Sequence, residues 1–293
     1  MRYLFLIISF VSSISFSQIA QYNSYPTLHS YKILDEKLDS ISFAFSMRQL
    51  NTSYVGPFLK LRRASDNAEL DFYKGFNDIV DIDSINSWRS GANVYVTTWY
   101  DQSGLGRNAV QPTTSFQPQF IPDSARPYFV GDGISDRLDV LTSIQILTNS
   151  GVNGTVSLVL YNTSRSQNSF GVLNVANRWS VHINWTNGRA YFDPGVCCNT
   201  PRDFINPVNV WKQYTFIRTS SSVVVRRNTV QVMNGSYTTG ACTISNNFGI
   251  LYANGANFNY STGRFTELIM YKYDIAAYKY KAIELNQIYF WNL

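Results

Sequence analysis

The chain has 293 residues and a formal net charge of +5, and only 15% of its residues are charged. Lysine and arginine form no block beyond the pairs Arg62-Arg63 and Arg226-Arg227, which lie in β-like segments, so the sequence argues against nucleic-acid binding. Abundant tyrosine and phenylalanine with few charges favour sheets over helices.

Residues 1–17 have the form of a secretory signal peptide. Arg2 precedes an apolar core over 3–11, and small residues follow up to Ser17. The core is shorter than the ~20 residues that a membrane span needs. We therefore expect cleavage after Ser17 and a protein that is secreted or held at the cell surface, and that is not transmembrane after cleavage.

Residues 18–293 predict a single all-β domain. An irregular lead-in runs to Lys37, a short helix over 81–90 has Asp83-Ser84 as its predicted cap, and the proline-rich stretch 111–127 is a predicted loop. Short strands punctuated by Gly and Asn turns favour a two-sheet sandwich. The predicted strands are 38–50, 58–63, 92–100, 154–161, 169–175, 180–185, 189–192, 210–218, 222–227, 231–233, 248–252 and 263–271.

Two Asn-Gly pairs and a C-terminal pattern complete these expectations. Asn187-Gly188 is a predicted two-residue hairpin turn, and Asn234-Gly235 is a second predicted turn. Apolar residues at Ile283, Ile288 and Tyr289 predict a short helix over 278–291.

The strand over 92–100 stops at the turn sequence Asp-Gln-Ser-Gly, residues 101–104. Aspartate in such a turn accepts backbone N–H bonds, and glycine allows positive φ. We expect Asp101 and Gly104 to be structural, with Asp101 accepting hydrogen bonds from Ser103 or Gly104. Glu267, in the last predicted strand, is an expected buried hydrogen-bond partner.

The chain has three cysteines, two of them adjacent: Cys197 and Cys198. Consecutive Cα atoms lie about 3.8 Å apart, below the usual ~4.4–6.8 Å of a disulfide, so a bond between neighbours requires a distorted or cis peptide. The residues alone leave three possibilities open: a vicinal bond, a bond from either cysteine to Cys242, or free thiols.

Several short segments resemble a known family. These are 46–50 (Ser-Met-Arg-Gln-Leu), 54–57 (Tyr-Val-Gly-Pro), 62–67 (Arg-Arg-Ala-Ser-Asp-Asn) and 100–104 (Tyr-Asp-Gln-Ser-Gly). They are similar to the catalytic domain of α-L-arabinofuranosidase B (glycoside hydrolase family 54-like), and more similar to bacterial concanavalin A-like/laminin-G-like modules. The resemblance implies a two-sheet jelly-roll sandwich with a short C-terminal helix. It also implies a vicinal disulfide in the segment Asp-Pro-Gly-Val-Cys-Cys at 193–198.

A glycosidase needs two carboxylates that flank the scissile bond. The family places its nucleophile, a glutamate, after the Cys-Cys pair and its acid before the last strand. The corresponding segments here read Asn-Thr-Pro-Arg-Asp-Phe (199–204) and Leu-Tyr-Ala-Asn-Gly-Ala-Asn (251–257). Neither matches the family pattern, so we expect no catalytic residues.

Carbohydrate binding requires less: aromatic faces for the sugar rings and a few polar groups in a concave site. The expected ligand-binding residues lie in or near the Cys-Cys loop, and they are Asp193, Cys197, Cys198, Trp185, Tyr191, Trp211, Tyr252 and Asn254. Phe192 is a further aromatic candidate. His182 is isolated and is expected to be structural or at the surface. No residues have metal-ligand spacing, and no cofactor is expected.

The sequence therefore predicts an exported, non-catalytic protein that binds a carbohydrate, with an arabinose-containing glycan among the candidates, or that adheres to a cell-surface partner. Two alternatives remain open at this point. One is an arabinofuranosidase-like hydrolase, and the other is a structural subunit of an extracellular or virion assembly.

Overall fold

The computed structural model describes residues 32–36, 40–163, 169–198, 200–255 and 259–293. Residues 32–293 form one compact unit. The predicted signal peptide and residues 18–31 and 37 of the lead-in lie outside the described residues. Within the described residues, no helix combines the length and apolarity that a membrane crossing requires.

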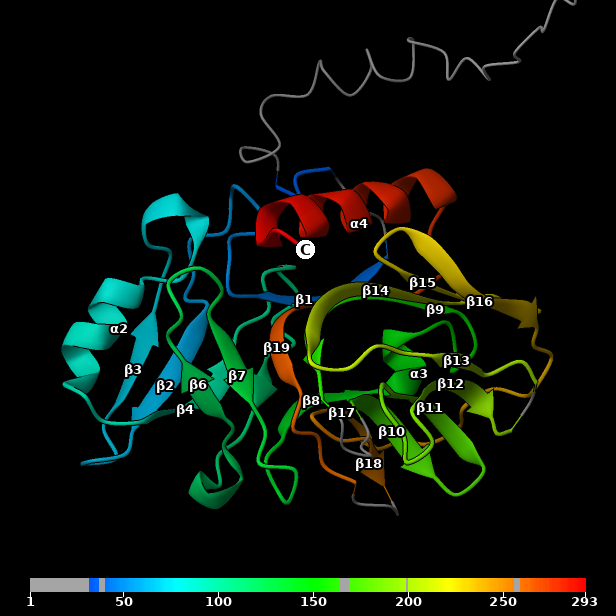
Figure 1. Ribbon diagram of the computed structural model, residues 1–293, viewed down its shortest axis with the longest axis horizontal. Helices are drawn as coiled ribbons and strands as arrows, with labels where there is room; N and C mark the ends of the chain where they lie inside the picture. The colour runs from blue at the N-terminus through cyan, green and yellow to red at the C-terminus, as the bar shows by residue number, and fades with distance from the viewer. Residues whose placement is uncertain (1–31, 37–39, 164–168, 199, 256–258) are drawn as a thin grey trace, which may run out of the picture. The chain divides into compact units, whose positions relative to one another are not determined.

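The described residues form an all-β sandwich, as predicted (Figure 1). One layer is antiparallel and carries the C-terminal helix on its outer side. Its strands, in spatial order, are β16 (Val230–Ser236), β15 (Ser222–Arg227), β14 (Val210–Arg218), β9 (Gly154–Asn162), β19 (Arg264–Tyr271) and β1 (Ile41–Ser46).

The second layer faces the first across the core. Its antiparallel strands, in spatial order, are β13 (Asp203–Ile205), β12 (Arg189–Val196), β11 (Asn177–His182), β10 (Phe170–Asn174), β17 (Asn247–Ile250), β8 (Leu138–Ser143) and β5 (Ala109–Val110). The two-residue strand β18 (Asn254–Gly255) pairs in parallel with β10.

A third group of strands joins the two layers through the pairs β4–β5 and β7–β19. Its strands, in spatial order, are β3 (Glu69–Phe72), β2 (Leu59–Arg63), β4 (Val94–Trp99), β6 (Gln119–Ile121) and β7 (Tyr128–Val130). Strand β6 lies within the stretch 111–127, which we had predicted to be loop throughout.

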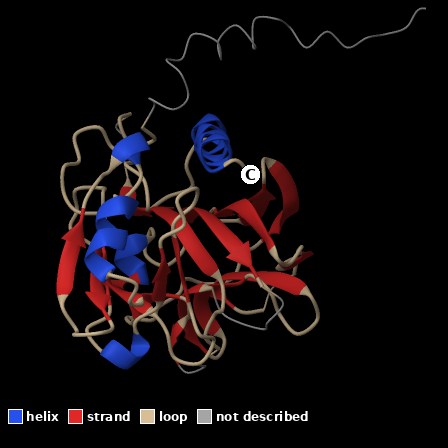
Figure 2. Cartoon of the chain, turned by 60° about the vertical axis from the view of Figure 1, so that its left-hand side comes forward, coloured by secondary structure: helices blue, strands red, loops and turns tan. Residues whose placement is uncertain are grey.

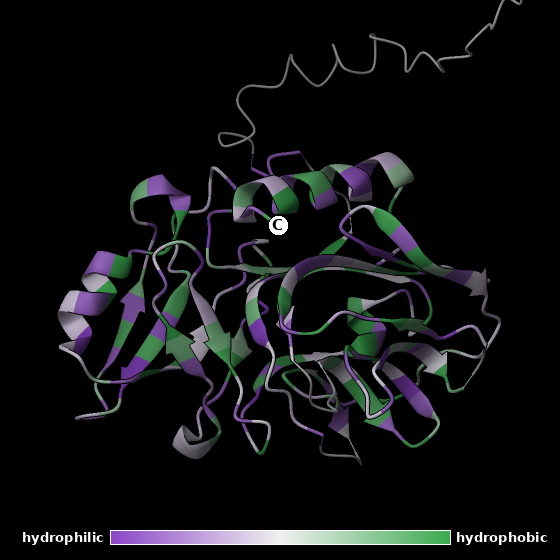
Figure 3. Ribbon diagram, viewed as in Figure 1, coloured by the Kyte–Doolittle hydropathy of each residue, from purple (hydrophilic) through white to green (hydrophobic). Residues whose placement is uncertain are grey.

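Side-chain alternation along the strands produces the core between the layers, and Figure 3 shows hydrophobic and hydrophilic bands along the strands. Phe216 of β14 meets Phe170 of β10 and Phe192 of β12, with ring centroids 5.8 and 5.3 Å apart. All three are fully buried. The outward side of β9 is buried as well, because the C-terminal helix packs over it. Ser157 of β9 donates a hydrogen bond to Gln287 of that helix (2.7 Å).

The described residues contain few helices, and Figure 2 sets them apart from the strands. They are the 3₁₀ turns η1 (Phe76–Asp78) and η2 (Thr114–Phe116) and the helices α2 (Ile82–Arg89), α3 (Ile144–Leu147) and α4 (Ala277–Trp291). The predicted C-terminal helix is confirmed, and of the apolar residues that indicated it Tyr289 is 51% exposed. The polar side chains of Glu284 and Gln287 are buried instead.

The helix α2 lies within the predicted range 81–90, but its cap is not the predicted Asp83-Ser84. Its N-cap is Asp81, whose Oδ1 accepts the N–H of Ser84 at 3.0 Å. Asp83 lies within the first turn. A residue with helical dihedral angles cannot serve as the cap, since the N-cap residue itself is extended.

Two turns differ from the predictions. Between β11 and β12, Gly188 donates its N–H to the carbonyl of Trp185 (2.9 Å), so Thr186 and Asn187 are the central residues and Gly188 follows with a φ of 73°. This is a three-residue hairpin loop rather than a two-residue one. Asn234-Gly235 is no turn; both residues continue strand β16.

The real turn before β16 is Asn228-Thr229. Arg227 pairs with Val230, and both intervening residues have positive φ, 45° and 69°. Such dihedral angles at both positions belong to a type I′ turn, whose twist matches that of the flanking strands. The sequence analysis missed it because threonine rarely adopts a positive φ.

Asp101 forms the predicted turn. Its carboxylate accepts the N–H groups of Ser103 (2.9 Å), Arg107 (3.0 Å) and Ala44 (2.8 Å), and the hydroxyl of Ser103 (2.7 Å). The side chain is almost fully buried, and Gly104 has a φ of 85°. The contact with Ala44 ties this turn to strand β1.

Glu267 is the centre of a buried polar network. Both its oxygens contact Arg48, at 2.7 and 3.0 Å, and the carboxylate also accepts hydrogen bonds from Ser46 (2.9 Å), Gln287 (3.0 Å) and Trp291 (2.9 Å). Glu267 is fully buried. Burial raises the pKa of its carboxyl, but the Arg48 guanidinium and the other donors outweigh burial and hold that pKa below its usual value. The network joins β1, β19 and α4.

Candidate functional site

The candidate site lies on the outer face of β10, β11 and β12, opposite the core. Trp179 and Val181 point into the core, so the alternate residues Arg178 and His182 of β11 point outward. They meet the outward residues of β12, because His182 pairs with Tyr191 and Ser180 with Asp193.

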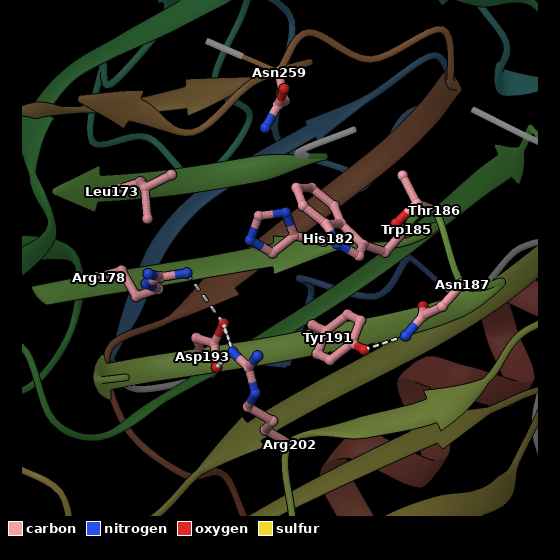
Figure 4. A pocket seen from close by; sticks show the side chains of 10 residues that line it. All are labelled: Leu173, Arg178, His182, Trp185, Thr186, Asn187, Tyr191, Asp193, Arg202 and Asn259. Carbon is pink, nitrogen blue, oxygen red and sulfur yellow. Dashed lines mark hydrogen bonds and ion pairs between the residues drawn. The ribbon is translucent and has the colours of Figure 1, made fainter. Parts of the chain in front are cut away.

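These side chains surround a pocket of about 290 Å³ (Figure 4). This is near the lower end of the ~300–1,000 Å³ usual for small-ligand sites. The described residues that line it are Leu173, Arg178, His182, Trp185, Thr186, Asn187, Tyr191, Asp193, Arg202 and Asn259.

Asp193 is the charged centre of the pocket and is fully buried. Nη1 of Arg202 lies 2.9 Å from both of its oxygens, and Nη1 of Arg178 lies 3.5 Å from one of them. Burial raises the pKa of the Asp193 carboxyl, while the two guanidinium groups oppose that shift. The guanidinium of Arg202 also lies over the ring of Tyr191, 4.7 Å from its centroid.

His182 forms part of the pocket wall, although the sequence suggested a structural or surface residue. Its ring meets Trp185 edge to face, with centroids 4.8 Å apart, and only 6% of the residue is exposed. Burial, reinforced by Arg178 and Arg202, lowers the pKa of the imidazole to about 3, so it is neutral at pH 7. Among the described residues, its Nδ1 has no hydrogen-bond partner.

The vicinal disulfide is present: Cys197 is bonded to Cys198 across a cis peptide. Cys242 is a free, buried thiol, so it forms no disulfide with Cys197 or Cys198. The disulfide directly follows strand β12, and Sγ of Cys197 lies 3.2 Å from Nη1 of Arg202. It therefore sits beside the charged end of the pocket.

One group in the described part of the chain has donor atoms close enough for a metal ion: Asp193, Cys197 and Cys198, within 4.8 Å of one another. The two sulfurs are joined in a disulfide, whereas a metal requires thiolates. The carboxylate is already held by Arg202. The oxidised group does not fit a metal ion.

The structure brings three of the predicted ligand-binding residues together in the pocket: Trp185, Tyr191 and Asp193. The Tyr191 hydroxyl accepts a hydrogen bond from Asn187 (2.6 Å). Phe192 points into the core and is not a candidate, because it lies one residue out of phase with its neighbours on β12.

Cys197 and Cys198 lie beside the pocket, whereas the remaining predicted residues lie elsewhere on the sandwich. Trp211 packs between the rings of Tyr128 and Tyr161, each 5.6 Å away. Tyr252 donates a hydrogen bond to Asp139, and Asn254 contacts the same carboxylate at 3.4 Å. Burial raises the pKa of Asp139, a residue that the sequence analysis did not single out.

Sequence reasoning missed several residues of the pocket wall, namely Leu173, Arg178, Thr186, Asn187, Arg202 and Asn259. The alternation Arg178, Ser180, His182 against Trp179 and Val181 is a signal that could have identified the outward face of β11. The two segments in which the family carries its catalytic carboxylates include residues 199 and 256–258, which lie outside the described residues. The expectation that this chain has no catalytic carboxylates there therefore stays a prediction.

No protein-family model matches this chain, and neither does any curated protein. Solved structures do. An arabinofuranosidase complexed with arabinofuranosyl-α-1,2-xylobiose has a TM-score of 0.68 and 15% identity, over 87% of this chain and 64% of that one. A GH54 α-L-arabinofuranosidase soaked with a cyclic sulfate inhibitor has a TM-score of 0.66 and 15% identity, over 85% and 63%.

A third structure, a mutant of GH54 α-L-arabinofuranosidase soaked with 4-nitrophenyl α-L-arabinofuranoside, has a TM-score of 0.62 and 16% identity, over 85% of this chain and 63% of that one. The chain thus spans less than two thirds of the length of these enzymes. At such identities the likeness concerns the fold alone, and it confirms the predicted two-sheet β-sandwich, which resembles that of the GH54 arabinofuranosidases.

Proposed function

We propose that this protein binds a carbohydrate in the pocket on β10, β11 and β12 and does not hydrolyse it. The carrying observation is the pocket wall itself, in which the aromatic rings of Trp185 and Tyr191 stand beside polar side chains. Aromatic faces stack on sugar rings, while a few polar groups fix their orientation. The likeness to the arabinofuranosidase fold, seen with bound arabinofuranosyl-xylobiose in one relative, supports a sugar as the ligand.

The non-catalytic part of the proposal rests on the carboxylates. Glycoside hydrolysis normally uses two, one on each side of the scissile bond. Among the described residues that line the pocket, Asp193 is the one carboxylate. Arg202 holds both of its oxygens, which leaves it poorly placed as a nucleophile or proton donor.

We also propose that the protein works outside the cell, as a secreted or surface-held binding protein. The support is the signal-peptide form of residues 1–17. A vicinal disulfide beside the pocket is compatible with an oxidising compartment.

A glycan array probed with residues 18–293 tests the binding proposal. We expect binding to at least one glycan class, and at least tenfold weaker binding after Trp185→Ala or Tyr191→Ala. Tyr278→Ala is the matched control, since Tyr278 is a 70% exposed aromatic residue on α4. An unchanged affinity in both pocket variants would place the sugar elsewhere.

A hydrolysis assay on an aryl α-L-arabinofuranoside tests the other half of the proposal. We expect no turnover above the buffer rate. Turnover that disappears when one aspartate or glutamate is replaced by its amide would establish an enzyme and refute the non-catalytic proposal.

A further inference from the structure

We infer that the carbohydrate bound in this pocket is acidic, with a carboxylate or sulfate group that lies against Arg178 and Arg202. This inference rests on the proposed function and adds the chemical class of the ligand. It follows from the charge balance of the pocket, from its unused hydrogen-bond donors and from the neutral histidine beside them.

The charge balance comes first. Two guanidinium groups, those of Arg178 and Arg202, share the single carboxylate of Asp193. His182 is uncharged at pH 7, since its pKa is lowered to about 3. The nearby pair Arg189–Asp203 cancels itself. The pocket therefore holds at least one positive charge in excess, and protonation of Asp193 would only increase it.

The other two fully buried carboxylates that form ion pairs face a single cation each. Arg48 faces Glu267, and Arg226 faces Glu284, one cation to one anion in each case. A buried charge without a partner is costly, so proteins normally compensate it. In the pocket, the side chains of Arg178 and Arg202 keep 16% and 27% of their surface exposed, so a ligand anion can reach them.

The arginines also retain donors for such an anion. A guanidinium has five N–H groups. Nε of Arg178 is buried and has no hydrogen-bond partner within the described part of the chain. The described side-chain hydrogen bonds of Arg202 all come from Nη1. Planar pairs of guanidinium N–H groups match carboxylate and sulfate oxygens in geometry and charge.

The remaining wall suits the sugar ring of an acidic saccharide better than a bare anion. Tyr191 lies next to Arg202, and Trp185 lies next to His182, so apolar ring faces adjoin the cationic end. The imidazole of His182 is 94% buried and neutral, and its free Nδ1 can exchange a hydrogen bond with a sugar hydroxyl. Figure 4 shows these groups around one space.

The test compares matched ligands by calorimetry: methyl β-D-glucuronide against methyl β-D-glucoside, methyl α-D-galacturonide against methyl α-D-galactoside, and galactose 6-sulfate against galactose. We expect the acidic member of at least one pair to bind at least tenfold more tightly. Since the preference is electrostatic, it should shrink when NaCl rises from about 50 to about 500 mM. Whether the carboxylate or the sulfate pair responds identifies the acidic group.

Variants locate the effect. Arg178→Gln should remove most of the preference for the acidic member of the pair, and Arg178→Lys should retain part of it. Arg189→Gln is the control, because Arg189 pairs with Asp203 outside the pocket lining. Melting temperatures of all three variants show whether each is folded.

The outcomes separate the inference from the proposed function. Equal affinity for acidic and neutral members overturns the inference and leaves carbohydrate binding standing. Inorganic sulfate or acetate that binds as tightly as the acidic sugars overturns it as well, since the site would then recognise only an anion. If no glycan on the array binds, neutral or acidic, the proposed function itself is refuted.

Discussion

Replacement of Glu267 by glutamine should cost this protein a large part of its stability. The substitution keeps the size of the side chain and removes its charge. Arg48, which is 2% exposed and held by Glu267 through two contacts, would then be a buried cation without an anion. The new amide group would also place N–H donors opposite one neighbouring donor, either Gln287 or Trp291, according to which oxygen the nitrogen replaces.

The magnitude follows from this geometry. Breaking a buried ion pair by removal of one partner costs about 3–5 kcal/mol. The three further hydrogen bonds to the carboxylate cannot simply be added, because glutamine keeps one acceptor oxygen, so we expect a total of about 4 kcal/mol. At roughly 2–4 °C per kcal/mol for a domain of this size, the melting temperature should fall by about 8–16 °C.

Urea denaturation followed by circular dichroism at pH 7 measures this loss. Asp66→Asn is the control, because Asp66 pairs with Arg63 on the surface, where ion pairs contribute about 0–1 kcal/mol. The folded-state pKa of Glu267 is lowered, so its contribution is complete above the unfolded pKa of about 4.3 and is lost as the pH falls through the folded value. A loss below about 1 kcal/mol at pH 7, or a loss that does not shrink below about pH 4, would refute the reasoning.

Three further predictions concern single side chains. Asp101→Ala removes four hydrogen bonds to a buried carboxylate and should destabilise the protein by about 2–4 kcal/mol in the same denaturation assay. An effect under 1 kcal/mol would contradict the structural role of the turn. In the folded protein His182 stays neutral down to about pH 3, whereas in the unfolded chain it takes up a proton near pH 6.5. The stability of the wild type should therefore fall as the pH drops below about 6.5, and that of His182→Asn should fall less between pH 7 and 4. Burial and the neighbouring Asp132 raise the pKa of Asp136 to about 7. The contribution of Asp136 to the stability of the fold is therefore complete below pH ~4 and is lost as the pH rises through 7. The Asp136→Asn variant should melt at a higher temperature than the wild type at pH 8 but not at pH 4.5.

The strand pattern and the fold class could be predicted because each depends on short-range information. Alternation along 154–161 and the apolar run of 210–218 indicate strands, and the series of short strands favours a sandwich. The turn at Asp101 was equally predictable, since aspartate bonds to backbone groups two residues away. The vicinal disulfide was predicted from the resemblance to the family, because geometry alone left open which cysteines are bonded.

Turn positions were predicted less well, and the apolar pattern that indicated α4 did not show which of its side chains are buried. Asn228 and Thr229 form a type I′ turn because the pairing of β15 with β16 requires it, against the intrinsic preference of threonine. In α4 the buried side includes Glu284 and Gln287, polar residues whose partners lie on distant strands. A helical pattern read from apolar residues alone cannot reveal a polar interface.

By itself, then, the sequence identified many of the strands and the turn that Asp101 forms, and it predicted Asp193, Tyr191 and Trp185 as ligand-binding residues near the Cys-Cys loop. Only the tertiary structure decided which side chains share the pocket. Arg178, His182 and Arg202 meet Asp193 because β11 and β12 pair in a particular register, which sets His182 opposite Tyr191 and Ser180 opposite Asp193. A shift by one residue would turn the same side chains toward the core. Register depends on contacts across the whole sandwich, and for that reason the positive pocket could not be predicted from the sequence alone.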